Sequence, residues 1–361
     1  MDHGDAGPGG SWPMVVRVPV EPVEAAMEAD AVDAVARAGD VMVRGPLFGV
    51  AAQEAGDGRR WRVVVAVTAG CPQLARDSLN SQLWFRAKDG AEDRAERRAL
   101  LAAVARLETE RVDELDVAGT RYRVVRAEEY GGSGPDGMEG PRPTDPEPPV
   151  PDWDRTAKGP AVDEGLVVDP RAPVTPTQAV EQLALRGLCY AGERFPEDVR
   201  ADSVRALETH PDVVLLPATF EVVERTAKGW KAVSGPYATA HEARRSLDFA
   251  LTWAWPRMHG LIPPDTDPAA DARTFAAGGT ATSAVAAELA EYAEAAGTLR
   301  AAGRVNRLEF RDTVYQIVRT RRLLRWGPDG PEGPRPSDVN TQDPARIHLT
   351  LDEDGNVHPE D

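Results

Sequence analysis

Residues 134–145 read GPDGMEGPRPTD and residues 327–338 read GPDGPEGPRPSD, so one chain contains nearly the same twelve-residue phrase twice. We call these stretches the first and second repeated phrase. Pro-Asp-Gly is typical of a tight turn, because proline fixes φ and glycine accepts a backbone conformation that bulkier residues resist. The Pro-Arg-Pro that follows is extended and rigid. Each phrase is therefore predicted to leave a strand, turn, and lie across a surface.

The sequence before each phrase repeats as well. RVDELDVAGTRYRVVR (111–126) matches RVNRLEFRDTVYQIVR (304–319) at the same offset as the phrases, 193 residues. Earlier segments match in the same order at slightly smaller offsets, such as ADAVDAVARAGDVMVRGPLFGV (29–50) with ADSVRALETHPDVVLLPATFEV (201–222). Matches that keep one order along the chain are most simply interpreted as a tandem duplication.

The duplication divides the chain into five parts. The offset grows by about 25 residues within the second copy, which predicts an insertion at 256–279. The predicted parts are a disordered lead with a first strand (1–20), copy one (21–145), a Pro- and Asp-rich linker (146–175), an extra helix with copy two (176–338), and a strand with an acidic tail (339–361).

Each copy begins with apolar residues at helical spacing and continues with a predicted hairpin rich in β-branched residues. Helices that begin near Pro72 or Ala240 come next, and two strands with alternating apolar residues follow. This order, α-β-β-α-β-β, predicts the α+β class with antiparallel sheets. We expect the helices to cover one sheet face. We also expect the two copies to pack as an internal pseudo-dimer.

Composition limits the class of protein. The 361 residues carry 42 Lys and Arg against 59 Asp and Glu, a net charge of −17, which disfavours binding to nucleic acid or to an anionic membrane. The two cysteines are too few for a disulfide framework, so the reducing cytoplasm is the expected compartment. No signal peptide, membrane span, phosphate loop or metal motif is present, so no cofactor is expected.

Two residues are weak catalytic candidates. Cys71 precedes Pro72 at a predicted helix start, where the helix dipole favours a thiolate. We favour a capping role, because copy one offers no histidine as a base. His259 lies in the predicted insertion near Trp253 and Trp255, which either line a pocket or belong to the core.

Arginines are the candidates for anion binding. VRTRRLLR (318–325) places Arg319, Arg321 and Arg325 on one strand face by alternation. They form an anion or nucleic-acid site, or they pair with the acidic linker or are simply solvated, and we favour the last two interpretations. The repeated phrases contribute Arg142 and Arg335, which either clamp a carboxylate or phosphate or tie each loop to its own domain through Asp145, Asp338 or a backbone carbonyl. We favour the tie.

The segments VRGPLFGV, CPQLARDSL, RYRVVRAEEY and WGPDGPEGPRPSD resemble a family of actinobacterial, Streptomyces-type proteins that carries only a domain-of-unknown-function label. The resemblance extends over nearly the whole chain. It implies a cytoplasmic bacterial protein, and it implies no activity, ligand or catalytic residue.

Three functions are compatible with the sequence. The favoured one is a non-catalytic interaction or regulatory module that binds a protein partner. Such a module is compatible with a monomer, because the two copies pair with each other. The alternative is a small-molecule binder or enzyme with a site between the repeats near Trp253, His259 and Arg319 to Arg325. A nucleic-acid role is disfavoured by the net charge.

Overall fold

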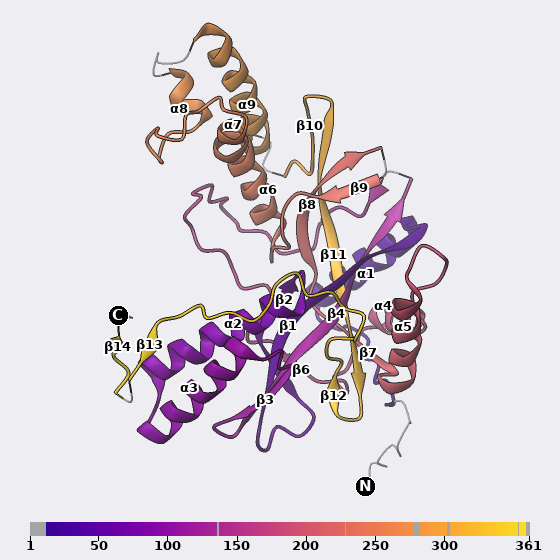
Figure 1. Cartoon of the computed structure of the whole chain (residues 1–361). Helices are drawn as coiled ribbons and strands as arrows, with labels where there is room; N and C mark the ends of the chain where they lie inside the picture. The colour runs from indigo at the N-terminus through magenta and orange to yellow at the C-terminus, as the bar shows by residue number, and fades with distance from the viewer. Residues whose placement is uncertain are drawn as a thin grey trace.

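A computed structural model describes residues 12–135, 137–227, 229–277, 282–301, 304–352 and 354–358. Strands β4 and β11 run through the middle of the molecule, α2 and α3 lie at one end, and α6 to α9 lie at the other (Figure 1). The helices are α1 (Pro22–Arg37), α2 (Pro72–Phe85), α3 (Arg94–Thr109), α4 (Pro176–Leu185), α5 (Glu197–Thr209), α6 (Ala240–Phe249), α7 (Trp255–Met258), α8 (Ala272–Ala277) and α9 (Ser283–Ala301), with π-helical turns at Arg86–Gly90 and Ala250–Ala254.

The strands form one large sheet and one small hairpin. Within the described residues the large sheet has twelve strands, and its longest path runs in the order β6-β2-β1-β4-β11-β8-β9. The strands are β1 (Asp40–Glu54), β2 (Trp61–Ala69), β3 (Glu114–Val117), β4 (Thr120–Gly134), β5 (Gly137–Met138), β6 (Val167–Val168), β7 (Asp212–Leu215), β8 (Thr219–Thr226), β9 (Gly229–Ala232), β10 (Arg307–Phe310), β11 (Thr313–Gly327), β12 (Gly330–Pro331), β13 (Thr350–Leu351) and β14 (Val357–His358).

The central pair joins the two halves of the chain. Strand β4 lies antiparallel to β11, with Tyr130 opposite Arg321 and Glu128 opposite Leu323. All pairs between the named strands are antiparallel, which confirms the predicted α+β class. The segments before and after the linker therefore share one continuous sheet.

Alternation along β4 separates the two faces of the sheet. The even-numbered Tyr122 and Val124 belong to the core formed with α2 and α3. The odd-numbered Val125 and Ala127 belong to a core that includes Trp61 of β2 and residues of the linker. The linker thus covers the sheet face opposite the helices. Apolar side chains on that face need other apolar groups to shield them from water.

Several local predictions can be compared with these elements. The helices expected near Pro72 and Ala240 begin at those residues, and the extra helix after the linker is α4. Residues 12–20 contain an isolated bridge from Val16 to Val174 where a first strand was predicted. The lead 1–11 and residues 278–279 of the predicted insertion lie outside the described residues. None of the described helices is both long and apolar enough to cross a membrane.

Candidate functional site

A cavity of about 600 Å³ lies between helices α1 and α4 and the central strands β4 and β11. Apolar side chains from the two helices form its walls, among them Met27 and Val35 of α1 and Val180 of α4. These three side chains are at least half exposed, so the cavity opens to solvent. Its volume lies within the range of pockets that hold drug-sized molecules.

The floor of the cavity is polar. Tyr130 donates a hydrogen bond of 2.6 Å to Oε1 of Glu181 on α4, and Nη1 of Arg321 donates to Oε2 of the same carboxylate. Burial raises the pKa of Tyr130, so the phenol remains a neutral donor. Nε of Arg321 is buried and has no hydrogen-bond partner among the described residues.

Two more guanidinium groups line the cavity. Nε of Arg319 donates to both oxygens of Asp145 at 3.1 Å, and Nε of Arg142 donates to Oε1 of Glu139 at 2.5 Å. Within the described part of the chain, no group accepts a hydrogen bond from the η nitrogens of Arg319 or Arg142. Each guanidinium is thus only partly paired, although a guanidinium carries five N–H donors.

The three arginines are close enough to affect one another. Burial lowers the pKa of Arg319, Asp145 opposes that shift, and the positive charges of Arg142 and Arg321 lower the pKa further. Like charges that share a site disfavour the charged form, and an added anion relieves their repulsion. Glu139, Asp145 and Glu181 balance the charges of these arginines, so what the floor offers an anion is the set of guanidinium N–H donors that remain without an acceptor among the described residues.

Two glycines create the space. Gly131 and Gly132 follow Tyr130 on β4, and Gly132 lines the cavity. A Cβ at Gly132 would lie 3.2 Å from Oε2 of Glu139 and 3.5 Å from Cβ of Ala38. A larger side chain at this position would take up part of the cavity.

The predicted arginine face is divided between two environments. Arg319 and Arg321 reach the cavity and meet Arg142 there. Arg325 does not reach it, because its side chain is buried and its Nη2 donates to two backbone carbonyl oxygens between α4 and α5.

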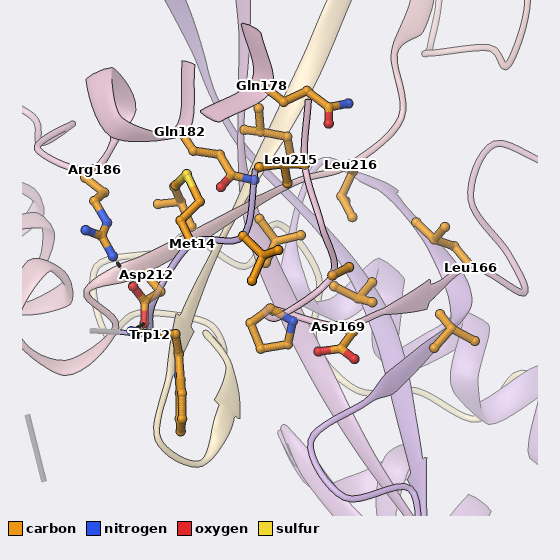
Figure 2. Close-up of a pocket in the computed structure, with 18 residues that line it drawn as sticks. Trp12, Met14, Leu166, Asp169, Gln178, Gln182, Arg186, Asp212, Leu215 and Leu216 are labelled. Carbon is orange, nitrogen blue, oxygen red and sulfur yellow. Dashed lines mark hydrogen bonds and ion pairs between the residues drawn. The ribbon is translucent and has the colours of Figure 1, made fainter. Parts of the chain in front are cut away.

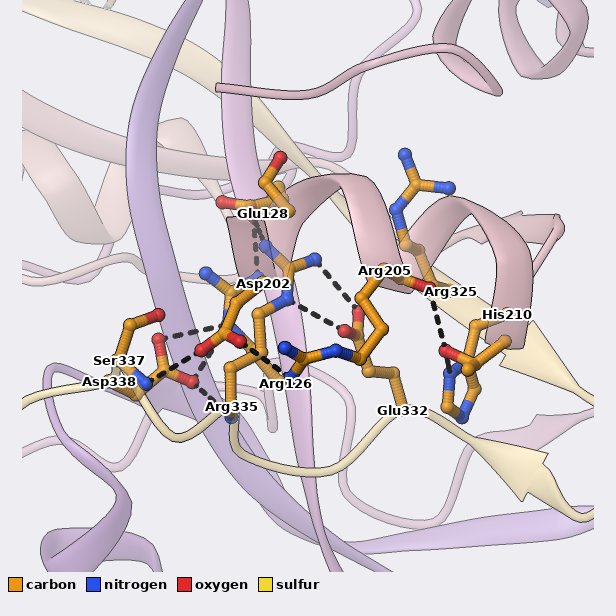
Figure 3. A network of polar contacts seen from close by, with 12 residues as sticks. Arg126, Glu128, Asp202, Arg205, His210, Arg325, Glu332, Arg335, Ser337 and Asp338 are labelled. Atoms are coloured by element: carbon orange, nitrogen blue, oxygen red, sulfur yellow. Dashed lines mark hydrogen bonds and ion pairs between the residues drawn. The ribbon is translucent and has the colours of Figure 1, made fainter. Parts of the chain in front are cut away.

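Arg335 belongs to a buried polar cluster on the other half of the chain (Figure 3). It makes two hydrogen bonds to Glu332, of 2.7 and 3.1 Å. Beside it, Arg126 donates to Glu128 at 2.5 Å and to Asp338 at 2.9 Å. These buried charges pair with one another, which offsets the large cost of removing them from water.

The opposite face of β11 carries a further arginine of the basic segment. The Arg322 side chain has no exposure to solvent, and its Nη1 donates to Asp163 at 2.5 Å. Asp163 belongs to the linker, so at this position, on the face opposite the predicted arginines, the basic strand pairs with the acidic linker.

Trp253, Trp255 and His259 do not line the cavity. Trp253 stacks on Phe249 with ring centroids 5.1 Å apart, and Trp255 lies 5.1 Å from the ring of Tyr315. Nδ1 of His259 lies 2.8 Å from the Tyr292 hydroxyl oxygen. These residues belong to the helical layer around α6, α7 and α9, and none of the three lines the cavity that Arg319 reaches.

Cys71 stands at the N-cap of α2 but makes no capping hydrogen bond. Its thiol is buried, and the Thr341 hydroxyl donates to Sγ at 3.3 Å. Burial raises the pKa of the thiol, while hydrogen bonds that include the one from Thr341 lower it by more. A thiol covered in this way is a poor nucleophile for an external substrate.

A smaller cavity of about 160 Å³ lies on the other side of the first turn of α4 (Figure 2). Gln178 lines both cavities. In the smaller one, Arg186 points at Asp212, and that carboxylate also accepts a hydrogen bond of 3.1 Å from the backbone N–H of Trp12. Its volume suits water better than an organic ligand.

The described residues contain no group of three or more His, Cys, Asp or Glu side chains that could hold a metal ion. Sequence reasoning missed Tyr130, Glu139, Glu181 and the apolar faces of α1 and α4. One signal was available, since Tyr-Gly-Gly in copy one replaces bulky residues at the matching place in copy two. Glycines inside a strand pattern mark a close approach or a space for a ligand.

The sequence model of one protein family, described as a family of unknown function (DUF5954), matches residues 21–341. No curated protein and no solved structure matches the chain.

Proposed function

The chain belongs to this family of unknown function, and from its site we propose that it is a non-catalytic protein that binds a small organic molecule. One observation carries the proposal. A cavity with apolar walls also holds, on its floor, three arginines whose η nitrogens are partly unpaired. Pockets of this kind, apolar with a few convergent polar groups, are the usual form of small-molecule sites.

We also propose that the chain is a tandem duplication whose copies pack as an internal pseudo-dimer. At the offset of 193, Glu128 corresponds to Arg321 and Tyr130 to Leu323. When each residue is replaced by its counterpart, the pair Tyr130–Arg321 becomes the pair Leu323–Glu128, which is the other observed pair. This pattern is that of a local two-fold axis between Glu129 and Arg322, the isologous arrangement expected for two equal units.

The repeated phrases support the same proposal, because each crosses to the other copy. Asp145 of the first phrase pairs with Arg319, and Asp338 of the second phrase pairs with Arg126. The hairpins that begin the phrases have one register, with Ser133 opposite Met138 and, 193 residues later, Trp326 opposite Pro331. We interpret the phrases as reciprocal clasps between the copies.

The internal pairing is consistent with a monomeric protein. Both cysteines are free thiols, which is compatible with the reducing cytoplasm that we propose as its compartment. An actinobacterial source remains part of the proposal and rests on the resemblance of the sequence segments.

Ligand binding is tested by native mass spectrometry of the protein isolated from its own cell, followed by mass analysis of any released small molecule. We expect one retained molecule per chain. The variant Gly132→Val is expected to lose it, because the added side chain enters the cavity. Gly235→Val is the matched control, since a Cβ at Gly235 meets no atom within 4 Å. Equal retention by wild type and Gly132→Val would refute the site.

A second candidate function is the interaction module favoured by the sequence. The observation in its favour is a run of exposed apolar residues before and at the start of α1, with Val18, Val20 and Val23 69%, 81% and 72% exposed. Exposed apolar patches often mark protein contacts. Affinity purification from the native cell with wild type and with Val20→Asp distinguishes this candidate, since a partner held there is expected to be lost from the variant.

A further inference from the structure

We infer that the bound molecule is a monocarboxylate with an apolar body, and that its carboxylate lies between Arg319 and Arg142. This inference rests on the proposed function and names the ligand class for the same cavity. It comes from a comparison of the cavity with its counterpart in the other copy.

The counterpart site contains a carboxylate of the protein itself. Glu128 accepts hydrogen bonds from Nη1 of Arg126 at 2.5 Å and from Nη1 of Arg335 at 3.4 Å (Figure 3). It also accepts one of 2.6 Å from the Tyr190 hydroxyl. One carboxylate therefore joins an arginine of the central strand to the arginine of a repeated phrase. The side chain of Glu128 is only 6% exposed, so this site is closed.

The cavity keeps both arginines and lacks that carboxylate. At the offset of 193, Arg126 corresponds to Arg319 and Arg335 corresponds to Arg142. The position of Glu128 is taken by Arg321, whose guanidinium pairs with Glu181 on α4 instead. As a result, the η nitrogens that bind a carboxylate in the closed site have no acceptor among the described residues of the open one.

The comparison of the two sites also explains why the open site has room for a carboxylate. Arg325 corresponds to Gly132, so the open site lacks a long side chain that the closed site contains. An external carboxylate can then occupy the place that Glu128 fills in the closed site. Planar carboxylates match the forked geometry of guanidinium groups.

Charge favours a monoanion over a phosphate monoester. Three guanidinium groups on the floor, those of Arg142, Arg319 and Arg321, are opposed by the carboxylates of Glu139, Asp145 and Glu181. Further carboxylates, those of Glu28 and Asp40, line the same cavity. A dianion would add two uncompensated negative charges to such a floor and a monoanion only one, so the charge count disfavours a phosphate more strongly. The carboxylate is held by the η N–H donors of Arg142 and Arg319 that lack an acceptor in the described part of the chain.

The walls determine the rest of the molecule. Met27, Ala31 and Val35 of α1 face the cavity together with Val180 and Ala184 of α4. Burying apolar ligand surface against them contributes roughly 25 cal/mol per Å², so an aliphatic or aromatic body adds affinity. A fully polar metabolite would leave these side chains without partners.

Isothermal titration calorimetry with decanoate, decanol, decyl phosphate and decyltrimethylammonium, each below its micelle concentration, tests the inference on the full-length chain. We expect decanoate to bind one molecule per chain and decanol to bind at least about tenfold more weakly, since a charge-assisted hydrogen bond is worth roughly a factor of ten or more. Arg319→Met and Arg142→Met should reduce decanoate affinity to that of decanol. Arg307→Met, which removes an exposed arginine paired with Glu309, should not.

A second variant remains informative if loss of Arg319 unfolds the chain. Arg321→Glu combined with Glu181→Gln places a carboxylate at the position that corresponds to Glu128 and removes the neighbouring negative charge. We expect this chain to keep its circular dichroism spectrum and melting temperature, because the introduced carboxylate can pair with the guanidinium groups of the floor. We also expect it to lose decanoate binding, since its own carboxylate then occupies the site.

The outcomes separate the two proposals. Equal affinity for decanol, tighter binding of decyl phosphate or of the ammonium compound, or undiminished decanoate binding by the double variant would each overturn the carboxylate inference. Failure of all four probes would overturn it as well. The proposed function would still stand if the native protein retains a molecule that Gly132→Val loses, and it falls if no molecule is retained or if Gly132→Val retains it equally.

Discussion

Gly330 is the point at which the second repeated phrase crosses onto copy one. Its φ is +117°, and a Cβ there would lie 2.8 Å from Nε1 of Trp61 and 3.0 Å from Cε2. Trp61 is only 1% exposed, so its ring has no free space to move into. Gly330→Ala therefore adds backbone strain of about 1–3 kcal/mol and overpacking of about 1–3 kcal/mol.

Gly229→Ala separates the two contributions. Gly229 has nearly the same φ, +120°, but nothing lies within 4 Å of its added Cβ. Denaturant titration followed by tryptophan fluorescence should show Gly330→Ala to be less stable than Gly229→Ala by about 1–3 kcal/mol. Trp61→Phe should recover part of the difference. Equal stability of the two alanine variants would refute the close contact between this phrase and Trp61.

Three further predictions concern buried or paired groups. In the native protein, Cys189 should react with iodoacetamide before Cys71, because Cys71 is fully buried and Cys189 is partly exposed; mass spectrometry that finds Cys71 modified first would contradict the structure. Burial raises the pKa of Glu242, so the ionisation of this carboxyl group lowers the stability of the fold as pH rises through that pKa. Glu242→Gln should therefore raise the melting temperature at pH 7 and should differ little from wild type near pH 3. Hydrogen bonds from two arginines of β4 lower the pKa of Asp329 to about 2. The stability that the ionised Asp329 contributes is therefore present at neutral pH and is lost as pH falls from about 4 towards 2. Thermal melts should show that Asp329→Asn destabilises the chain slightly at pH 7 and does not do so at pH 2.

The sequence predicted the α+β class and the turns of the repeated phrases, because both depend on local patterns. Alternation on β11 placed Arg319, Arg321 and Arg325 on one face, and the structure has them there. The same pattern could not show that Arg325 is buried while Arg319 reaches a cavity. That difference depends on which helix covers each half of the strand, which is information about tertiary packing.

The reciprocal crossing of the phrases was not predicted either. The favoured prediction was that Arg142 and Arg335 tie each loop to its own domain through Asp145, Asp338 or a backbone carbonyl. Asp145 and Asp338 do accept hydrogen bonds from the backbone N–H groups of those arginines, at 2.7 Å in both cases. Their ion pairs, however, are with arginines of the opposite half of the chain. A sequence repeat gives the equivalence of two units but not their contacts.

The comparison of the two halves also gives a reason why one site is closed and one is open. A buried guanidinium is costly unless a carboxylate neutralises it, and Glu128 does this for Arg126 in the closed half. Exchange of that glutamate for Arg321 would be severely destabilising if the new site were sealed. It is tolerated because Gly132 leaves a cavity open to solvent and α4 supplies Glu181 as a new partner. The pairing of Arg321 with Glu181 of α4 and the space beside Gly132 therefore depend on each other, and Glu181→Gln alone should weaken the fold more than Glu181→Gln in the Arg321→Glu background.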